Sequence, residues 1–133
     1  MLEPEDVVLL NIEKAKQSLT SAHILFSHTD FSGAVNRLYY CVFYCARALL
    51  SNENVDFKKH SGVISYFRKE YIKTGILEQR LSDIIGELFS DRVGCDYDTS
   101  FSVNKEDVER EIKDAEFFLE KITEYLKAKG KLI

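Results

Sequence analysis

The chain has 133 residues, of which 45% are hydrophobic and 30% charged, and its formal net charge is −4. This composition excludes an intrinsically disordered chain, because disordered chains carry few apolar residues and a large net charge. It also argues against a protein that coats nucleic acid through positive charge alone. The length suits one domain and no Pro-, Gly- or Ser-rich linker interrupts it, so we expect a single domain over residues 1–133.

The N-terminal residues are acidic where a secretory signal would be basic, and no apolar run reaches the ~18 residues of a membrane span. The three cysteines, Cys41, Cys45 and Cys95, cannot all pair, and the first two lie one helical turn apart. Reduced thiols in the cytoplasm are therefore the expected state, and we expect no association with a membrane. No zinc-ligand spacing or phosphate-binding glycine loop occurs, so no metal and no cofactor is expected.

A first helix is predicted over residues 5–28. Pro4 suits the first turn of a helix, and the acidic Glu5 and Asp6 complement the positive end of the helix dipole. Apolar residues then recur at helical spacing and predict one buried stripe: Val8, Ile12, Ala15, Leu19, Ala22 and Phe26.

A second helix is predicted over residues 32–51, with Asp30 or Ser32 as its N-cap. It is apolar nearly all the way round, which is typical of the most buried helix of a bundle. One narrower stripe is mixed, and consists of Arg37, Tyr40, Tyr44 and Arg47. These residues either pack their rings and extend their charges to solvent, or form an interface with a partner, since Tyr and Arg often anchor partner surfaces.

Three more helices are predicted over residues 58–73, 77–91 and 104–129, with Gly75 ending the third and Asn104 capping the fifth. No segment alternates with the period of a β-strand. The expected fold is therefore all-α, an up-and-down bundle of about five helices.

Positive charge is concentrated in residues 57–80, which contain six Lys or Arg residues and two Glu residues. This segment is either a solvated helix face or the best local candidate for contact with phosphate. The basic residues that we single out as a candidate patch are Lys58, Lys59, Arg68 and Lys69.

Four polar residues could take part in binding or catalysis. They are Arg92, Asp96 and Tyr97 after the fourth predicted helix, and His60 at the start of the third. Taken alone, Arg92 beside acids at a helix end suggests a local ion pair, and His60 suggests a surface histidine. Asp91, Asp96 and Asp98 match no familiar cation-binding loop.

Four segments change this interpretation when they are read together: NRLYYCVFYCARALL, KKHSGVISYF, the turn with Lys73 and Gly75, and RVGCDY. Their order and spacing resemble the HEPN family of small helical domains over nearly the whole chain. The resemblance implies an up-and-down bundle, a homodimer and, in many members, a ribonuclease site shared across the dimer. It also implies a possible partner, because many members are encoded beside a minimal nucleotidyltransferase as toxin–antitoxin pairs.

The family's ribonuclease motif is an arginine followed, after four to six residues, by a histidine. Arg92 matches the arginine, but the histidine positions hold Tyr97, Asp98 and Thr99. Metal-independent RNA cleavage needs a base for the 2′-hydroxyl, an acid for the leaving oxygen and a cation for the phosphorane charge. Arg92 could supply the cation, whereas Tyr97, with an ordinary pKa near 10, is a weak base at neutral pH.

The favoured hypothesis is a homodimeric module that binds a nucleotide or RNA phosphate, acts with a nucleotidyltransferase, and cleaves RNA weakly or not at all. Two alternatives stay open: an active ribonuclease toxin that uses Arg92 with His60 or Tyr97, and a helical scaffold without either activity. Consecutive antiparallel helices bring the start of the third to the end of the fourth. We therefore expect His60 and Arg92 to lie within ~12 Å, in one cleft with Asp96 and Tyr97.

Overall fold

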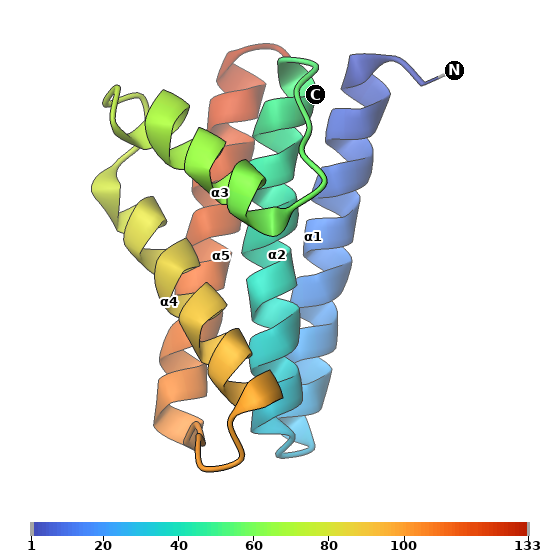
Figure 1. The fold of residues 1–133 in the computed structure, drawn as a ribbon. Coiled ribbons are helices and arrows are strands. Elements are labelled where there is room, and N and C mark those ends of the chain that lie inside the picture. Colours follow the sequence, from blue (N-terminus) through green and yellow to red (C-terminus); the bar gives the residue numbers. More distant parts are fainter. Residues whose placement is uncertain (1, 133) are drawn as a thin grey trace.

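The computed structural model describes residues 2–132 and contains five α-helices and one π-helical turn (Figure 1). The elements are α1 (Pro4–Ser27), α2 (Phe31–Asn52), α3 (His60–Phe67), the π-helical turn η1 (Arg68–Ile72), α4 (Gln79–Tyr97) and α5 (Lys105–Ala128). The helices α1, α2 and α5 stand side by side, while α3 and α4 cross them on one face. Residues 2–132 contain no strand, so the predicted all-α bundle is confirmed. Within that range, no helix combines the length and the apolar character needed to cross a bilayer.

The α1–α2 hairpin forms where the capping residues predicted it. At the start of α1, Pro4 occupies the first turn, and the Asp6 carboxylate accepts a hydrogen bond of 3.2 Å from the Glu3 N–H. Thr29 turns the chain with a φ of 60°, and the Asp30 side chain then accepts a hydrogen bond of 2.9 Å from the Gly33 N–H. Of the two predicted caps for α2, the structure therefore uses Asp30.

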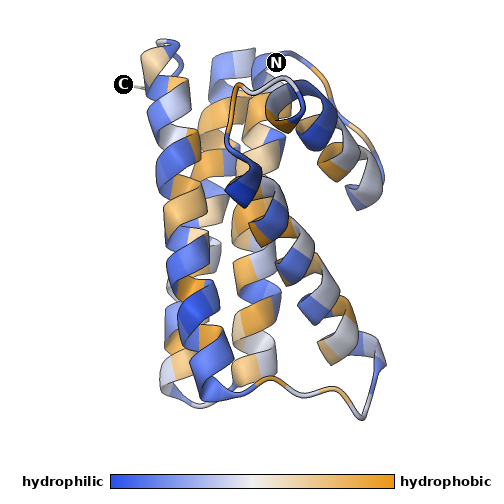
Figure 2. Ribbon diagram, turned by 90° about the vertical axis from the view of Figure 1, so that its left-hand side faces the viewer, coloured by the Kyte–Doolittle hydropathy of each residue, from blue (hydrophilic) through white to orange (hydrophobic). Residues whose placement is uncertain are grey.

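The core is built around α2, which packs against each of the other four helices. Twelve of its residues are buried, and Figure 2 shows hydrophobic positions of the helices facing one another inside the bundle. The largest side chains with almost no exposure include Tyr39, Phe67 and Phe118, which come from α2, α3 and α5. The prediction that the second helix is the most buried one is confirmed.

Three predicted boundaries differ from the structure by more than one residue, and only the end of the fourth helix differs by more than two. The third helix begins at His60 rather than residue 58, and its second half widens into η1. The fourth helix starts at Gln79 and continues to Tyr97 instead of ending at residue 91.

The extended part of α4 contains a close packing contact at a glycine. Gly94 lies against the ring of Phe101, where an added Cβ would come within 2.7 Å of the ring. The glycine is therefore needed for close approach inside the helix rather than for a turn. The helix stops at Asp98, whose carboxylate accepts a 2.9 Å hydrogen bond from the Ser100 N–H. As a result, Arg92 and Asp96 lie on one helical face, four residues apart.

Candidate functional site

Arg92 of α4 lies over the two adjacent tyrosines in the middle of α2. Its guanidinium carbon is 5.1 Å from the centre of the Tyr39 ring and 5.3 Å from that of Tyr40. A cation this close to aromatic faces is stabilised by their negative electrostatic potential. The extended α4 carries the arginine to this position.

His60, the first residue of α3, contacts the same two tyrosines. Its Nδ1 atom is 2.9 Å from the Tyr39 hydroxyl, and its ring centre is 5.7 Å from that of Tyr40. The imidazole also packs on Phe43, with ring centres 4.1 Å apart. The α2 aromatics thus hold the imidazole in place by one hydrogen bond and several ring contacts.

The structure brings His60 and Arg92 together. The His60 ring centre is 5.8 Å from the Tyr39 ring centre, and the Arg92 guanidinium carbon is 5.1 Å from the same point. The sum of these two distances bounds the separation of the two groups at about 11 Å, within the ~12 Å that one bound phosphate can bridge.

The positive charge of Arg92 is only partly neutralised. Its side chain is 18% exposed, and the nearest carboxylate oxygen, on Asp96, is 3.4 Å from Nε. This ion pair lacks hydrogen-bond geometry, so the buried Nε–H has no hydrogen-bond partner among the described residues. A buried donor without an acceptor is costly, and an anionic oxygen at this point would remove the cost.

Burial keeps both partners of the Tyr39–His60 hydrogen bond neutral near pH 7. It lowers the pKa of His60, and the positive charges of Arg92 and Arg47 lower it further. Burial also raises the pKa of Tyr39 far above its ordinary value, although the positive charge of Arg92 lowers it by a smaller amount. Because a tyrosine hydroxyl can donate or accept, the Nε2 atom of His60 can present either a lone pair or an N–H.

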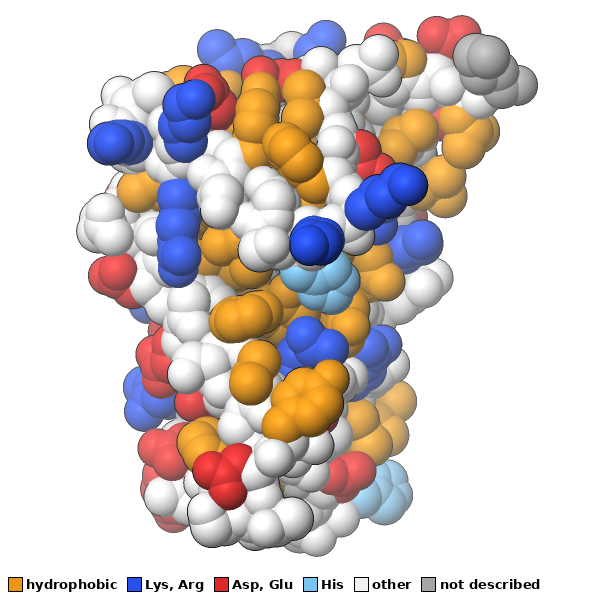
Figure 3. Space-filling view, in the orientation of Figure 1, with side chains coloured by type: hydrophobic (Ala, Val, Ile, Leu, Met, Phe, Trp, Pro, Cys, Tyr) orange, Lys and Arg blue, Asp and Glu red, His pale blue; other side chains and the backbone are white. Residues whose placement is uncertain are grey.

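An open pocket of about 310 Å³ adjoins His60. It is lined by Phe43, Arg47, Asp56, Phe57, Lys58 and His60. Figure 3 shows Lys and Arg side chains gathered around a histidine on the face where α3 crosses the bundle. Arg47 and Asp56 form an ion pair of 2.9 Å, and the hydrogen bond from Arg47 lowers the pKa of Asp56. We call this concavity the His60 pocket.

The predicted basic patch is divided between two places. Lys58 lines the His60 pocket, and the exposed Lys59 is the N-cap of α3. Arg68 and Lys69 line a separate groove, where Arg68 donates hydrogen bonds to the Ser82 side chain and backbone. The four residues therefore do not form one surface.

The mixed stripe of α2 also divides. Tyr40 supports Arg92 and His60, and Arg47 lines the His60 pocket. Arg37 lies 4.9 Å from the Tyr40 ring centre, while Tyr44 is covered from α1 by the Lys14 ammonium at 5.5 Å. Tyr97, at the end of α4, is 78% exposed.

Sequence reasoning did not single out Tyr39, Phe43 or Asp56 as parts of the site. Tyr39 and Phe43 lie in the apolar run of α2, where they resemble ordinary core residues. One signal was present, because a tyrosine in a fully buried helix must find a hydrogen-bond partner for its hydroxyl. That partner, His60, lies 21 residues away and follows only from the fold.

The lowered pKa of His60 predicts a pH effect on stability. The unfolded chain binds a proton at His60 near pH 6.5, whereas the folded chain binds it only at lower pH. The free energy of unfolding of the wild type should therefore decrease as pH falls from about 7 towards 5, because protonation of His60 favours the unfolded chain. In His60→Gln this decrease should be smaller. Urea titrations of both proteins at several pH values measure the difference, and parallel curves would contradict the prediction.

Comparison with known proteins agrees with this architecture. The model of the HEPN domain matches residues 8–126. Two relatives from Methanocaldococcus jannaschii are named "Putative toxin": one is 40% identical over 90% of this chain and 81% of its own length, the other 37% identical over 87% and 86%. A "UPF0332 protein" of Thermotoga maritima is 35% identical over 96% of this chain and 98% of its own length. The chain therefore belongs to the HEPN domain family, as its sequence segments and its helical bundle indicate.

Proposed function

We propose that this chain is a toxin-like module that binds the phosphate of an RNA or a nucleotide at Arg92 and His60. The observation that carries the proposal is the partly exposed guanidinium of Arg92 near the imidazole, whose buried Nε–H lacks a hydrogen-bond partner among the described residues. Family membership and the names of the archaeal relatives support it.

The surrounding residues fit a nucleotide chemically. Arg92 offers a planar set of donors that matches phosphate oxygens, and His60 in its Nε2–H form offers another. Lys58 adds a mobile positive charge on the rim of the His60 pocket. The ring of Phe57 in the same pocket is 40% exposed and provides a face on which a base can stack.

Binding with weak or absent cleavage is the function that we favour. The motif positions after Arg92 hold Tyr97, Asp98 and Thr99, none of which is a histidine. Tyr97 is also 78% exposed at the end of α4, outside the aromatic cluster. The site thus has a cation for phosphate but lacks the usual acid–base residue of the family motif.

One observation favours the alternative of a metal-independent ribonuclease. His60 contacts the same tyrosines as Arg92, and burial lowers its pKa so that its neutral form can accept a proton. In that case the lone pair of Nε2 would take the 2′-hydroxyl proton, Arg92 would stabilise the phosphorane charge, and a water molecule would protonate the leaving 5′ oxygen. This geometry favours His60 over Tyr97 as the base.

The experiment that separates these functions uses a labelled mixed RNA pool. Intact RNA retained by the protein, with little cleavage over hours and with much weaker retention by Arg92→Ala, would support the binding module. Cleavage in the presence of EDTA that is lost in both Arg92→Ala and His60→Gln would establish the alternative. If micromolar protein neither retains nor cleaves RNA, both functions are rejected and the helical scaffold remains.

We further propose that the module works in the cytoplasm as a homodimer, with a minimal nucleotidyltransferase as its partner. Exposed aromatic side chains flank Arg92 on α4, with Phe89 38% and Tyr97 78% exposed. Exposed aromatics of this kind are typical of protein interfaces. A two-fold axis near residues 92–97 would bring two sites together, as the family's composite site implies.

Light scattering tests the dimer directly. We expect the wild-type chain to be dimeric at micromolar concentration, and Tyr97→Glu to shift it towards monomer, since a charge would be buried at the axis. Ile24→Glu, which alters a 55% exposed apolar residue on α1, should stay dimeric and serves as the matched control. A monomeric wild-type protein would contradict the proposal.

A further inference from the structure

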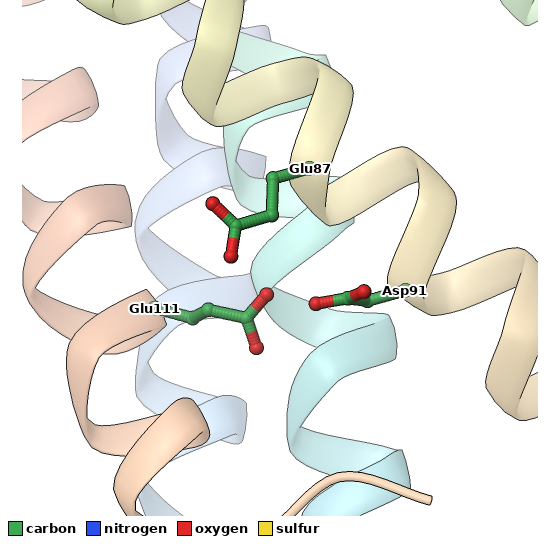
Figure 4. Close-up of side chains that lie close together, drawn as sticks. All are labelled: Glu87, Asp91 and Glu111. Carbon is green, nitrogen blue, oxygen red and sulfur yellow. The ribbon is translucent and has the colours of Figure 1, made fainter. Parts of the chain in front are cut away.

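Three carboxylates from two helices converge on the side of the bundle where α4 meets α5. Glu87 and Asp91 lie four residues apart on α4, and Glu111 comes from the second turn of α5. One oxygen of each lies within 4.8 Å of the others, and Figure 4 shows the three carboxylates pointing towards one another. We call these residues the carboxylate triad.

Glu111 is the unusual member of the triad. It is only 1% exposed, and neither of its carboxylate oxygens has a hydrogen-bond donor among residues 2–132. The nearby Arg110 does not supply one, because it pairs with Glu87 and Asp107 instead. Burying an ionised carboxylate without a donor is costly, so Glu111 is either protonated or neutralised by a bound cation.

We propose that the carboxylate triad binds a divalent cation with a preference for oxygen ligands, of the class of Ca²⁺, Mg²⁺ or Mn²⁺. Such ions take carboxylate ligands at about 2.0–2.6 Å, so ligand oxygens on opposite sides of one ion lie about 4–5 Å apart. The spacing in the triad meets this requirement. The ligand set contains no imidazole and no thiolate, which disfavours zinc and copper.

A shared proton is the competing explanation for the buried carboxylate. Burial and the neighbouring carboxylates of Asp91 and Glu87 raise the pKa of Glu111 to about 9, so without a cation it would hold a proton and donate it to Asp91. One proton satisfies two oxygens at most. A cation coordinates all three carboxylates at once and offsets their mutual repulsion, which is why we favour it.

The cation would have a positioning role for the phosphate site. Asp91 directly precedes Arg92 in α4, so a metal that ties Asp91 and Glu87 to Glu111 would fix this part of α4 against α5. The proposal does not depend on RNA binding, because the triad is tested with the metal alone.

The test is a binding titration of the EDTA-treated and dialysed 133-residue protein. Electron paramagnetic resonance of free Mn²⁺ should show one saturable site per chain, with a Kd between about 10⁻⁵ and 10⁻³ M. Ca²⁺ or Mg²⁺ should compete for it. Saturating cation should raise the Tm by roughly 5–10 °C, because a ligand of the native state stabilises it.

Two substitutions and one control make the result specific. Glu111→Gln and Asp91→Asn should each weaken Mn²⁺ binding at least ~10-fold, and the second variant decides if the first fails to fold. Asp83→Asn removes an exposed carboxylate one turn earlier on α4 and should bind Mn²⁺ like the wild type. The proposal is overturned if the wild type binds no Mn²⁺ below about 5 mM, or if binding survives both substitutions. If the wild type binds no cation and Glu111→Gln is more stable than the wild type, the shared proton would be established instead.

Discussion

Replacing Arg92 by alanine should weaken the binding of RNA or a nucleotide phosphate by a factor of about 10 to 100. Hydrogen bonds to charged groups contribute about 1.5–3 kcal/mol each, and this guanidinium has a donor that no described side chain satisfies. The domain should stay folded, because the ion-pair partner of Arg92 is Asp96, whose side chain is 34% exposed. Without Arg92 the Asp96 carboxylate would remain hydrated. Fluorescence anisotropy with a labelled single-stranded RNA measures the affinity, and circular dichroism verifies the fold.

Matched variants separate the geometry of Arg92 from its charge. Arg92→Lys should restore only part of the affinity, because an ammonium lacks the planar set of donors that matches a phosphate. Arg80→Ala removes another arginine from α4, one that lies over Phe117 and pairs with Asp114, and should bind RNA like the wild type. Equal losses in Arg80→Ala and Arg92→Ala would show that binding depends on net charge and would contradict a defined site.

Replacing Phe67 by alanine should give the largest loss of stability, about 3–5 kcal/mol. Phe67 has no exposed surface at the end of α3 and packs on Phe118 of α5, with ring centres 5.7 Å apart. Removing the ring would leave a cavity between two helices that surrounding side chains cannot fill. Since small domains are stable by only about 5–15 kcal/mol, this loss is a large part of the total.

Urea denaturation of wild type and variant measures this difference, with the slope of the transition as a check on two-state behaviour. Phe57→Ala makes the same change at a side chain that is 40% exposed and should cost about 1 kcal/mol. A loss below about 1 kcal/mol in Phe67→Ala would mean that α3 is not anchored through this contact. Because α3 begins with His60, a loosened α3 should also weaken RNA binding.

Local sequence patterns were sufficient for most of the fold. Apolar residues at helical spacing predicted five helices, and capping residues such as Asp30 and Asn104 placed their starts closely. The nearly continuous apolar run of α2 predicted its central position, because such a helix can be stable only when it is surrounded. These features depend on residues within a few turns of one another, which is why they can be read along the chain.

The assembly of the site depended on contacts between residues distant in sequence. The fourth helix was predicted to end at residue 91, whereas α4 continues past Gly94, against which the ring of Phe101 packs. The partner of the Tyr39 hydroxyl, and the meeting of His60 with Arg92, follow from how α3 and α4 cross α2. The carboxylate triad was missed for the same reason: Glu111 lies on the opposite side of a loop from Glu87 and Asp91, and its burial is a property of the packed bundle. The spacing of apolar residues along the sequence indicates which face of a helix is buried. Which polar groups meet on that face depends on how the helices pack against one another.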